Sequence, residues 1–450
     1  MKTKLRQIWD ALRTSYWFVP ALMVASAIWL SVVTVALDQR TNEWFGSLAF
    51  TYTRGPEGAR AILSTVAGSM MTVAATAFSI AIVALQLASS QFGPRLLRNF
   101  MGDTGNQIVL GTFISTFMYT LLVLRTIRAG EESEFVPNIS VTLSVFLAIA
   151  SVGVLIFFIH HTASSIQADT VIAEVGVELD RAIDRLFPKK IGRGASGDSQ
   201  QPVGEDIPEN FDREAGAVLA GKSGYIQAID EKKLLERATE NNLILRLNCR
   251  PGNFVVQGSH LLKVWPGKLL NQKLAKEIHE AFIFGNQRTH QQDVEFAVNQ
   301  LVEIAVRALS PGINDPYTAI RSVDQLSAAL SHLAERNIPS AYRYDEHNKL
   351  RAIAEPVTFA GVTDTAFNQI RQYGKSSVAV TIRLLEAIAA IAPHTGSESD
   401  RAVLLRHAGE IERSSRETVT AECDRKDIES RYQVALKALK PDEQPDEKPE

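Results

Sequence analysis

Long apolar runs without any Asp, Glu, Lys or Arg dominate the first 168 residues of the chain. The four runs are Thr14 to Leu37, Ala61 to Pro94, Thr104 to Leu124, and Phe135 to Ala168. Each is longer than the roughly 18 to 20 residues that an α-helix needs to cross a hydrocarbon core about 30 Å thick. The pattern therefore predicts four transmembrane helices in residues 1–168. The length of the first run, and the three runs after it, argue against a cleaved signal peptide.

The remaining residues have the mixed composition of a folded α+β region. Residues 169–187 carry apolar side chains at helical spacing and predict an amphipathic juxtamembrane helix. Residues 188–216, rich in Gly, Pro, Ser and acids, predict a flexible linker. Short runs typical of β-strands, broken by Pro and Gly, predict a small β-rich, barrel-like unit at 217–268, and a helical domain follows at 269–439. Residues 440–450 are acidic and contain proline, which is typical of a disordered tail.

Several local signals place elements within the helical domain. Thr289 and Gln292 have the spacing of a capping box before a helix that begins near Val294. Asp315 followed by Pro316 predicts an N-cap and first turn for a helix that ends near Ala334. A hairpin is expected at 345–350, and helices at 358–373, 376–391 and 397–439.

The second apolar run carries two stripes of small or polar side chains. Both follow a spacing of three and four residues, so each lies on one face of a helix, and the two faces are about 180° apart. The first stripe is alanine and predicts close helix packing; the second is polar and gives the candidate pore-lining residues. The alanines are Ala74, Ala77, Ala81, Ala84 and Ala88, and the polar residues are Thr72, Thr76, Ser79, Gln86 and Ser90.

Two interpretations of the polar stripe stay open at this point. Ser and Thr hydroxyls can donate to carbonyls one turn back, which favours a structural role. Gln86 cannot do so easily and requires a partner or water, which favours a water-lined pathway. Gln91, Arg95 and Arg98 follow the stripe and would form a basic cytoplasmic mouth that attracts anions or anionic lipid headgroups. Gly93 and Pro94 should end the helix there.

Charge and cysteine content predict how this multi-pass protein is oriented in its membrane. Lys and Arg residues precede the first run and separate the second from the third, so both termini are predicted to be cytoplasmic. The formal net charge of −3, without a large basic block, argues against nucleic-acid binding. Cys249 and Cys423 are too few and too far apart to predict a disulfide framework or a metal site.

No pattern of catalytic residues stands out. The loop with Ser310, Asn314 and Asp315 has no neighbouring base, and its residues are explained by turn chemistry, with ligand or partner binding as the alternative. His160 and His161 lie at the cytoplasmic end of the fourth span and are expected to act as interfacial anchors, because no intramembrane acid is available as a partner; pH sensing or proton handling is the alternative. Trp29 lies in the middle of a span and is expected to pack against another helix. We predict neither an enzyme nor a metal site.

Three segments resemble an uncharacterised bacterial family of predicted membrane proteins, domain of unknown function 2254. They are SSQFGPRLLRNFMGDTGNQIVLGTF, RALSPGINDPYTAI and GYIQAID. The resemblance implies a multi-span inner-membrane protein with a cytoplasmic C-terminal region, and it implies no catalytic residue. RPGNFVVQGSHLLKV is similar to the second half of biotinyl or lipoyl modules, but the modified lysine is absent, so no cofactor is expected.

The sequence thus predicts a homo-oligomeric, channel-like protein for ions or small solutes, embedded in the lipid bilayer. Its second span would line the pathway, and the cytoplasmic region would assemble or gate it. The alternative is a scaffold or sensor whose spans only anchor and oligomerise.

Overall fold

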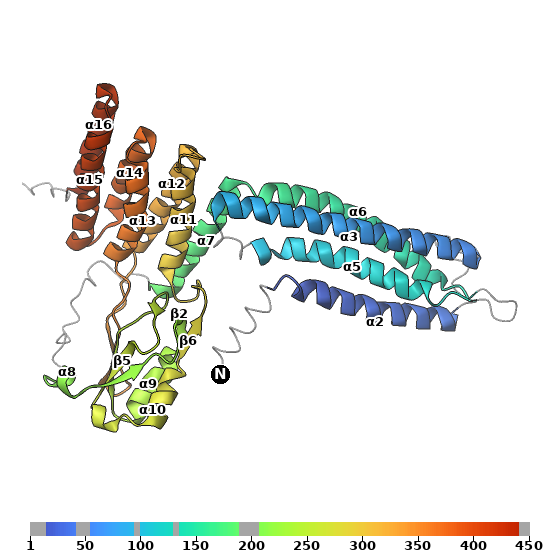
Figure 1. The fold of residues 1–450 in the computed structure, drawn as a ribbon, viewed down its shortest axis with the longest axis horizontal. Coiled ribbons are helices and arrows are strands. Elements are labelled where there is room, and N and C mark those ends of the chain that lie inside the picture. Colours follow the sequence, from blue (N-terminus) through green and yellow to red (C-terminus); the bar gives the residue numbers. More distant parts are fainter. Residues whose placement is uncertain (1–14, 42–54, 94–99, 129–134, 189–206, 441–450) are drawn as a thin grey trace, which may run out of the picture. The chain divides into compact units, whose positions relative to one another are not determined.

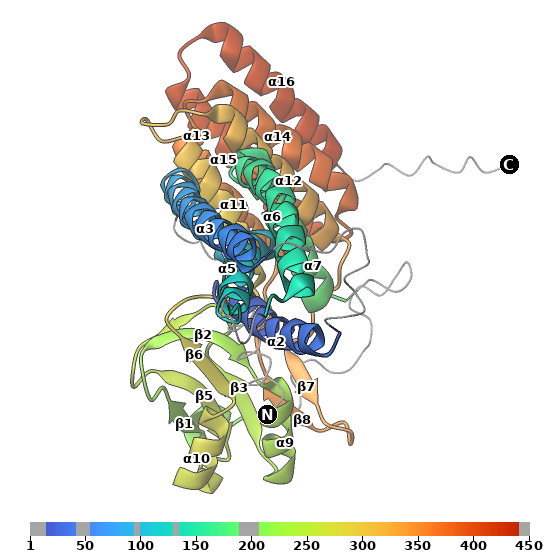
Figure 2. The same ribbon diagram turned by 90° about the vertical axis from the view of Figure 1, so that its right-hand side faces the viewer.

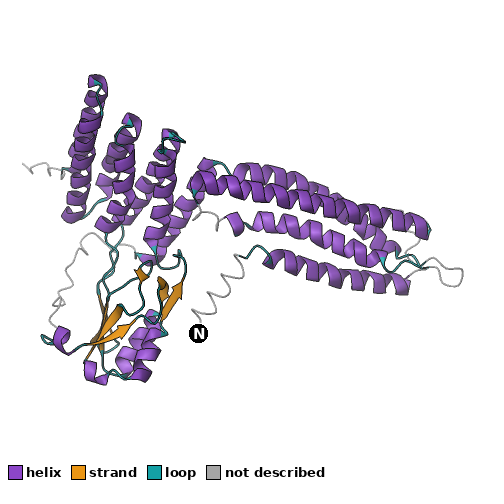
Figure 3. Ribbon diagram, viewed as in Figure 1, coloured by secondary structure: helices purple, strands orange, loops and turns teal. Residues whose placement is uncertain are grey.

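The computed structural model describes residues 15–41, 55–93, 100–128, 135–188 and 207–440 (Figure 1). The chain divides into two compact units, residues 1–170 and 171–450, which we call the membrane unit and the C-terminal unit. Figure 3 shows that the described chain is mostly helical and that its sheets belong to the C-terminal unit. The predicted tail and most of the predicted linker lie outside the described residues.

Four helices of the membrane unit are long and apolar enough to cross a membrane, as the sequence predicts. They are α2 (Phe18–Thr41), α3 (Pro56–Phe92), α5 (Thr104–Leu124) and α6 (Asn138–Ser165). At 1.5 Å per residue, the 37 residues of α3 span about 55 Å, considerably more than the hydrocarbon core. The helix ends at Phe92, where Gly93 takes a positive φ of 105°, so the predicted stop at this glycine is confirmed.

Helix α5 is the centre of the membrane unit. It contacts α2, α3 and α6. Half of the residues in its most apolar 18-residue stretch are buried, whereas 22% or fewer are buried in the corresponding stretches of the other three helices. Trp29 on α2 is 69% exposed, so it does not pack against another helix within the single chain.

Aspartate side chains cap the first turns of α5 and α6. Asp103 accepts the Gly105 N–H at 2.8 Å at the start of α5. Asp38, at the far end of α2 and only 2% exposed, accepts the N–H groups of Ile139 and Ser140 at 2.8 and 3.0 Å, and the Ser140 hydroxyl at 2.6 Å. Because the first N–H groups of a helix have no partner within it, a carboxylate is well suited to both places.

Buried hydroxyl pairs join the helices between these caps. The hydroxyl oxygens of Thr120 on α5 and Ser144 on α6 lie 2.9 Å apart. The hydroxyl of Tyr119 on α5 lies 3.0 Å from that of Thr34 on α2. Such contacts hold membrane helices together, because lipid offers polar groups no alternative partner.

The C-terminal unit contains two sheets, and the barrel-like unit at 217–268 stays a prediction. The five-stranded sheet has the order β1-β5-β3-β8-β7 and the three-stranded sheet the order β4-β2-β6. All neighbours are antiparallel except β3 and β8. The strands are β1 (Gly216–Leu219), β2 (Gly224–Ile229), β3 (Ile244–Leu247), β4 (Phe254–Val255), β5 (His260–Trp265), β6 (Phe282–Gly285), β7 (Tyr342–Tyr344) and β8 (Leu350–Ile353). The last three strands, β6, β7 and β8, lie beyond residue 268, in the region predicted to be a helical domain. Of these, β6 and β8 pair with strands of the predicted β-rich unit, and β7 pairs with β8.

The β7–β8 hairpin confirms the turn expected at 345–350 and is held by a buried ion pair. Arg351 Nε lies 2.8 Å from Asp345 Oδ2. The backbone N–H of Lys349 and the Arg351 guanidinium lower the pKa of Asp345 to about 2, so this carboxylate stays ionised.

Helices make up the rest of the C-terminal unit. Figures 1 and 2 show α11 to α16 gathered at one end of this unit and the sheets with α9 and α10 at the other. The helices are α7 (Ala168–Leu186), α8 (Phe211–Glu214), α9 (Glu231–Glu240), α10 (Gln272–His279), α11 (Val294–Ala308), α12 (Pro316–Ala334), α13 (Phe359–Gly374), α14 (Val378–Ile391), α15 (Glu398–Thr418) and α16 (Glu422–Leu439).

Two details of the helical region differ from the prediction. The N-cap of α11 is Asp293, which accepts the Phe296 N–H, and not the capping box at Thr289 and Gln292. The side-chain amide of Gln292 instead accepts the Ile229 N–H and donates to the Ile229 carbonyl, as the backbone of a neighbouring strand would. The single helix expected at 397–439 is two, α15 and α16, because residues 419–421 are not helical.

We predict that Asp38→Ala destabilises the membrane unit. The change leaves two buried N–H groups and a hydroxyl without an acceptor, which should lower the free energy of unfolding by about 2–4 kcal/mol. Asp38→Asn keeps one acceptor oxygen and should cost less. Thermal unfolding of the purified protein in detergent measures both; an alanine variant as stable as the original protein would contradict the capping role.

Candidate functional site: the outer face of α3

The alanine stripe of α3 lies in the interior of the membrane unit. Ala74, Ala77 and Ala81 are buried against residues of α5 and α6, among them Phe113 and Phe158. Ala88 is also buried, and Ala84 is half-buried. The small side chains let α3 approach its neighbours closely, which is how helices associate in lipid.

The polar stripe lies on the opposite side of α3, on the outside of the four-helix bundle. Thr72, Thr76, Ser79, Gln86 and Ser90 are all exposed. The stripe therefore does not line a pathway within one chain, and any pathway along it needs a second surface.

The exposed stripe is longer than the sequence analysis inferred. Thr65 and Ser69 are exposed as well and continue the alternating spacing of four and three residues toward the start of α3. The same spacing, followed upstream of Thr72, would have found them. We call the set Thr65, Ser69, Thr72, Thr76, Ser79, Gln86 and Ser90 the outer polar face.

Most hydroxyls of the outer polar face are bonded within their own helix. Thr72 donates to the Gly68 carbonyl and Thr76 to the Thr72 carbonyl, each at 3.0 Å. The Gln86 amide has no hydrogen-bond partner among the described residues. Of the side chains on this face, it therefore most needs a partner from outside the chain.

The predicted basic mouth is described only in part. Gln91 is exposed in the last turn of α3, while Arg95 and Arg98 lie outside the described residues. Their role stays a prediction.

The loop before α12 has the geometry of a helix end and a helix start. Ser310 donates to the Arg307 carbonyl, and Asn314 takes a positive φ of 50°. Asp315 accepts the N–H groups of Tyr317 and Thr318, so the predicted N-cap is confirmed. Ser310, Asn314 and Asp315 are thus each accounted for by turn chemistry.

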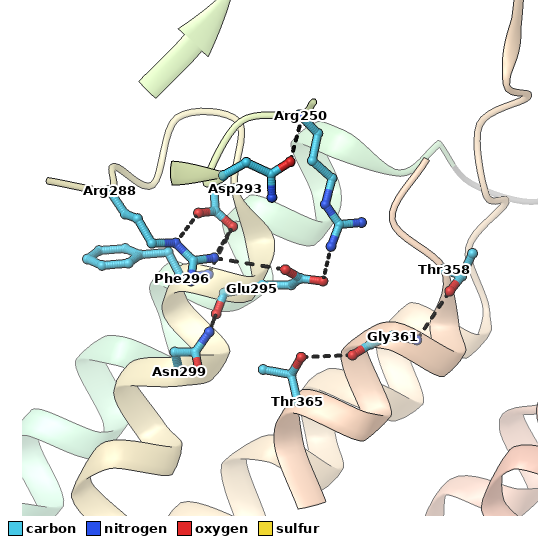
Figure 4. A network of polar contacts seen from close by, with 10 residues as sticks. Arg250, Arg288, Asp293, Glu295, Phe296, Asn299, Thr358, Gly361 and Thr365 are labelled. Carbon is cyan, nitrogen blue, oxygen red and sulfur yellow. Dashed lines mark hydrogen bonds and ion pairs between the residues drawn. The ribbon is translucent and has the colours of Figure 1, made fainter. Parts of the chain in front are cut away.

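A network of charges joins the loops of the C-terminal unit to α11 (Figure 4). Arg288 binds Asp293 through two bonds, at 2.6 and 2.8 Å, and Arg250 binds Glu295 at 2.7 Å. Gly252 is required beside them, because a Cβ there would lie 2.2 Å from Asp293 Oδ2. Each carboxylate of this network has a guanidinium partner, which is typical of a structural cluster and not of a catalytic pair.

Two histidines, His407 and His161, also pair with acids. His407 is fully buried with Nε2 2.8 Å from Asp364 Oδ1, and burial lowers the pKa of His407. His161 Nε2 lies 2.6 Å from Asp103 Oδ2, so His161 has an acidic partner at the N-cap of α5, just outside the charge-free runs. The partners are 43 and 58 residues apart in the chain, and no local spacing reveals them.

The fold and these sites define a multi-span α-helical membrane protein with an α+β C-terminal unit. The chain belongs to the family described as "Predicted membrane protein (DUF2254)", whose model matches residues 13–390. Uncharacterized proteins of Mycobacterium bovis and Mycobacterium tuberculosis are 33% identical to it over 436 residues, covering 94% of this chain and 81% of theirs. No solved structure matches the chain.

We expect Arg288→Ala to destabilise the C-terminal unit. Asp293 is nearly fully buried and would lose its bidentate partner, so the free energy of unfolding should fall by about 3 kcal/mol. Arg288→Lys keeps the charge but not the two parallel bonds and should fall in between. Chemical denaturation followed by circular dichroism compares the variants; no change for the alanine variant would refute the structural role of the pair.

Proposed function

We propose that the protein is a homo-oligomeric, channel-like protein of the bacterial inner membrane that passes ions or small solutes. In the proposed assembly the outer polar faces of α3 from several copies surround a common axis. The observation that supports this most strongly is the exposure of a row of polar side chains, interrupted at Val83, along the outside of α3.

The free energy of burying Gln86 favours such an assembly. An amide without a partner is costly in hydrocarbon, whereas a neighbouring copy or water would provide the missing hydrogen bonds. The alternating spacing of three and four residues along the face is also that of helices that pack with a left-handed twist. A second α3 could therefore follow the face along its whole length.

The proposed topology keeps both termini in the cytoplasm. Gln91, Arg95 and Arg98 would then surround the cytoplasmic mouth and favour anions there. Only Ile166 and Gln167 separate α6 from α7, the amphipathic helix that packs into the C-terminal unit. This short connection supports a role for the C-terminal unit in assembly or gating.

A membrane-anchored scaffold or sensor is the second candidate. The bonds that Thr72 and Thr76 form to their own helix favour it, because these hydroxyls need no water. In that case the outer polar face would only join copies of the chain.

Flux through liposomes that contain the purified protein distinguishes the two functions. In a water-filled pathway, Gln86→Leu puts an apolar group at the lining and should lower the flux on the order of tenfold, a barrier of about 1.4 kcal/mol. Ser26→Ala is the matched control, because Ser26 is exposed on α2, away from the outer polar face.

A folded wild-type protein that passes neither ions nor small solutes would overturn the channel proposal. Equal flux in the wild type and Gln86→Leu would remove α3 as the lining helix.

A further inference from the structure

Buried oxygen atoms without a hydrogen-bond partner gather at one end of the membrane unit. Among its described residues they are the Tyr16 hydroxyl, Asn106 Oδ1, Gln107 Oε1 and Thr162 Oγ1. Asn106 and Gln107 lie in the first turn of α5, and Thr162 lies in the last turns of α6. Neither the packing of the bundle nor the outer polar face of α3 accounts for these four atoms.

The side chain of Gln107 is fixed toward the start of α5. It is 1% exposed, and its Nε2 donates at 3.1 Å to the carbonyl of Met101, which precedes the helix. This bond also identifies which amide atom is the nitrogen, so the unpartnered atom is the oxygen. Oε1 is therefore held beside the first turn of α5.

The other groups belong to two further segments at the same end of the membrane unit. His161 on α6 lies 2.6 Å from Asp103 Oδ2, and Thr162, which is 7% exposed, is the next residue. The Tyr16 hydroxyl, just before α2, lies within electrostatic reach of the Asp103 carboxylate. Gly105 allows His161 to lie this close to the start of α5, because a Cβ at Gly105 would lie only 2.7 Å from His161 Nε2.

The chemistry of the donor set selects the kind of ligand. Two amide oxygens can only accept hydrogen bonds or bind a cation, and two hydroxyl oxygens can do the same. Asp103 adds one negative charge, with Oδ1 on the Gly105 N–H and Oδ2 on His161, and each oxygen keeps a further lone pair. An anion would be repelled by this carboxylate, and an apolar ligand would leave all four oxygens unsatisfied.

We propose that Tyr16, Asp103, Asn106, Gln107 and Thr162 form a binding site for a monovalent cation, such as sodium or potassium. Hard cations prefer oxygen ligands, and a single carboxylate among neutral oxygens balances one positive charge. His161 is a positioning residue, since it holds the carboxylate and does not face the cation as a ligand. The site is separate from the outer polar face, so it does not rest on the proposed channel function.

Equilibrium binding of radiolabelled sodium to the purified full-length protein in detergent tests the site, with choline replacing sodium at constant ionic strength. Asp103→Asn removes the charge but keeps an N-cap residue as good as aspartate. Gln107→Leu removes one oxygen at similar size. We expect saturable binding that potassium displaces, and at least about tenfold weaker binding in both variants.

The control is Ser26→Ala on the exposed side of α2, outside both the proposed cation site and the outer polar face, which should leave binding unchanged. Thr162→Val is a nearly isosteric further variant that decides the matter if Asp103→Asn does not fold, as judged by its melting temperature. No saturable binding of sodium or potassium by the wild type would overturn the proposal. So would equal binding in folded Gln107→Leu and Thr162→Val variants, which would mean that water or neighbouring side chains satisfy the oxygens.

Discussion

The membrane unit depends on one constraint, that helix ends and polar side chains in a bilayer must be satisfied from within the protein. Asp38 meets it for α6, and Asp103 meets it for α5. Each aspartate also links two helices. Asp38 on α2 binds the start of α6, and Asp103 at the start of α5 binds His161 near the end of α6. The two caps thereby set the register in which the central helix α5 and its neighbours pack.

The same constraint gives the outer polar face its significance. Inside the bundle, hydroxyls such as those of Thr120 and Ser144 are paired across helices. On the outer side of α3, Thr72 and Thr76 are satisfied within their own helix, and Gln86 has no partner among the described residues. A single chain therefore pairs hydroxyls between its inner helices but leaves the Gln86 amide without a partner on its outer surface, where the proposed oligomer would satisfy it.

Patterns along the chain predicted the elements better than the contacts between them. Charge-free runs predict the four spans because the bilayer sets a minimum length, and Asp315 with Pro316 predicts the start of α12 because capping is local. The pairs Asp38–Ser140 and Asp103–His161 join residues far apart in sequence, which no spacing reveals. Gln292 has the spacing of a capping box but pairs with Ile229 instead, because tertiary contact overrides a local preference. The sequence likewise could not predict that the polar stripe faces outward and the alanines inward.

Water accessibility along α3 tests the central claim most directly. Single cysteines would be placed in a background without Cys249 and Cys423, and labelled in membranes with a water-soluble maleimide. The account predicts labelling at 72, 76, 79, 86 and 90, and protection both at the buried alanines 74, 77, 81 and 88 and at the apolar exposed positions 82 and 87. Protection at all of these positions would contradict an aqueous pathway and leave the outer polar face as a dry contact between copies of the chain.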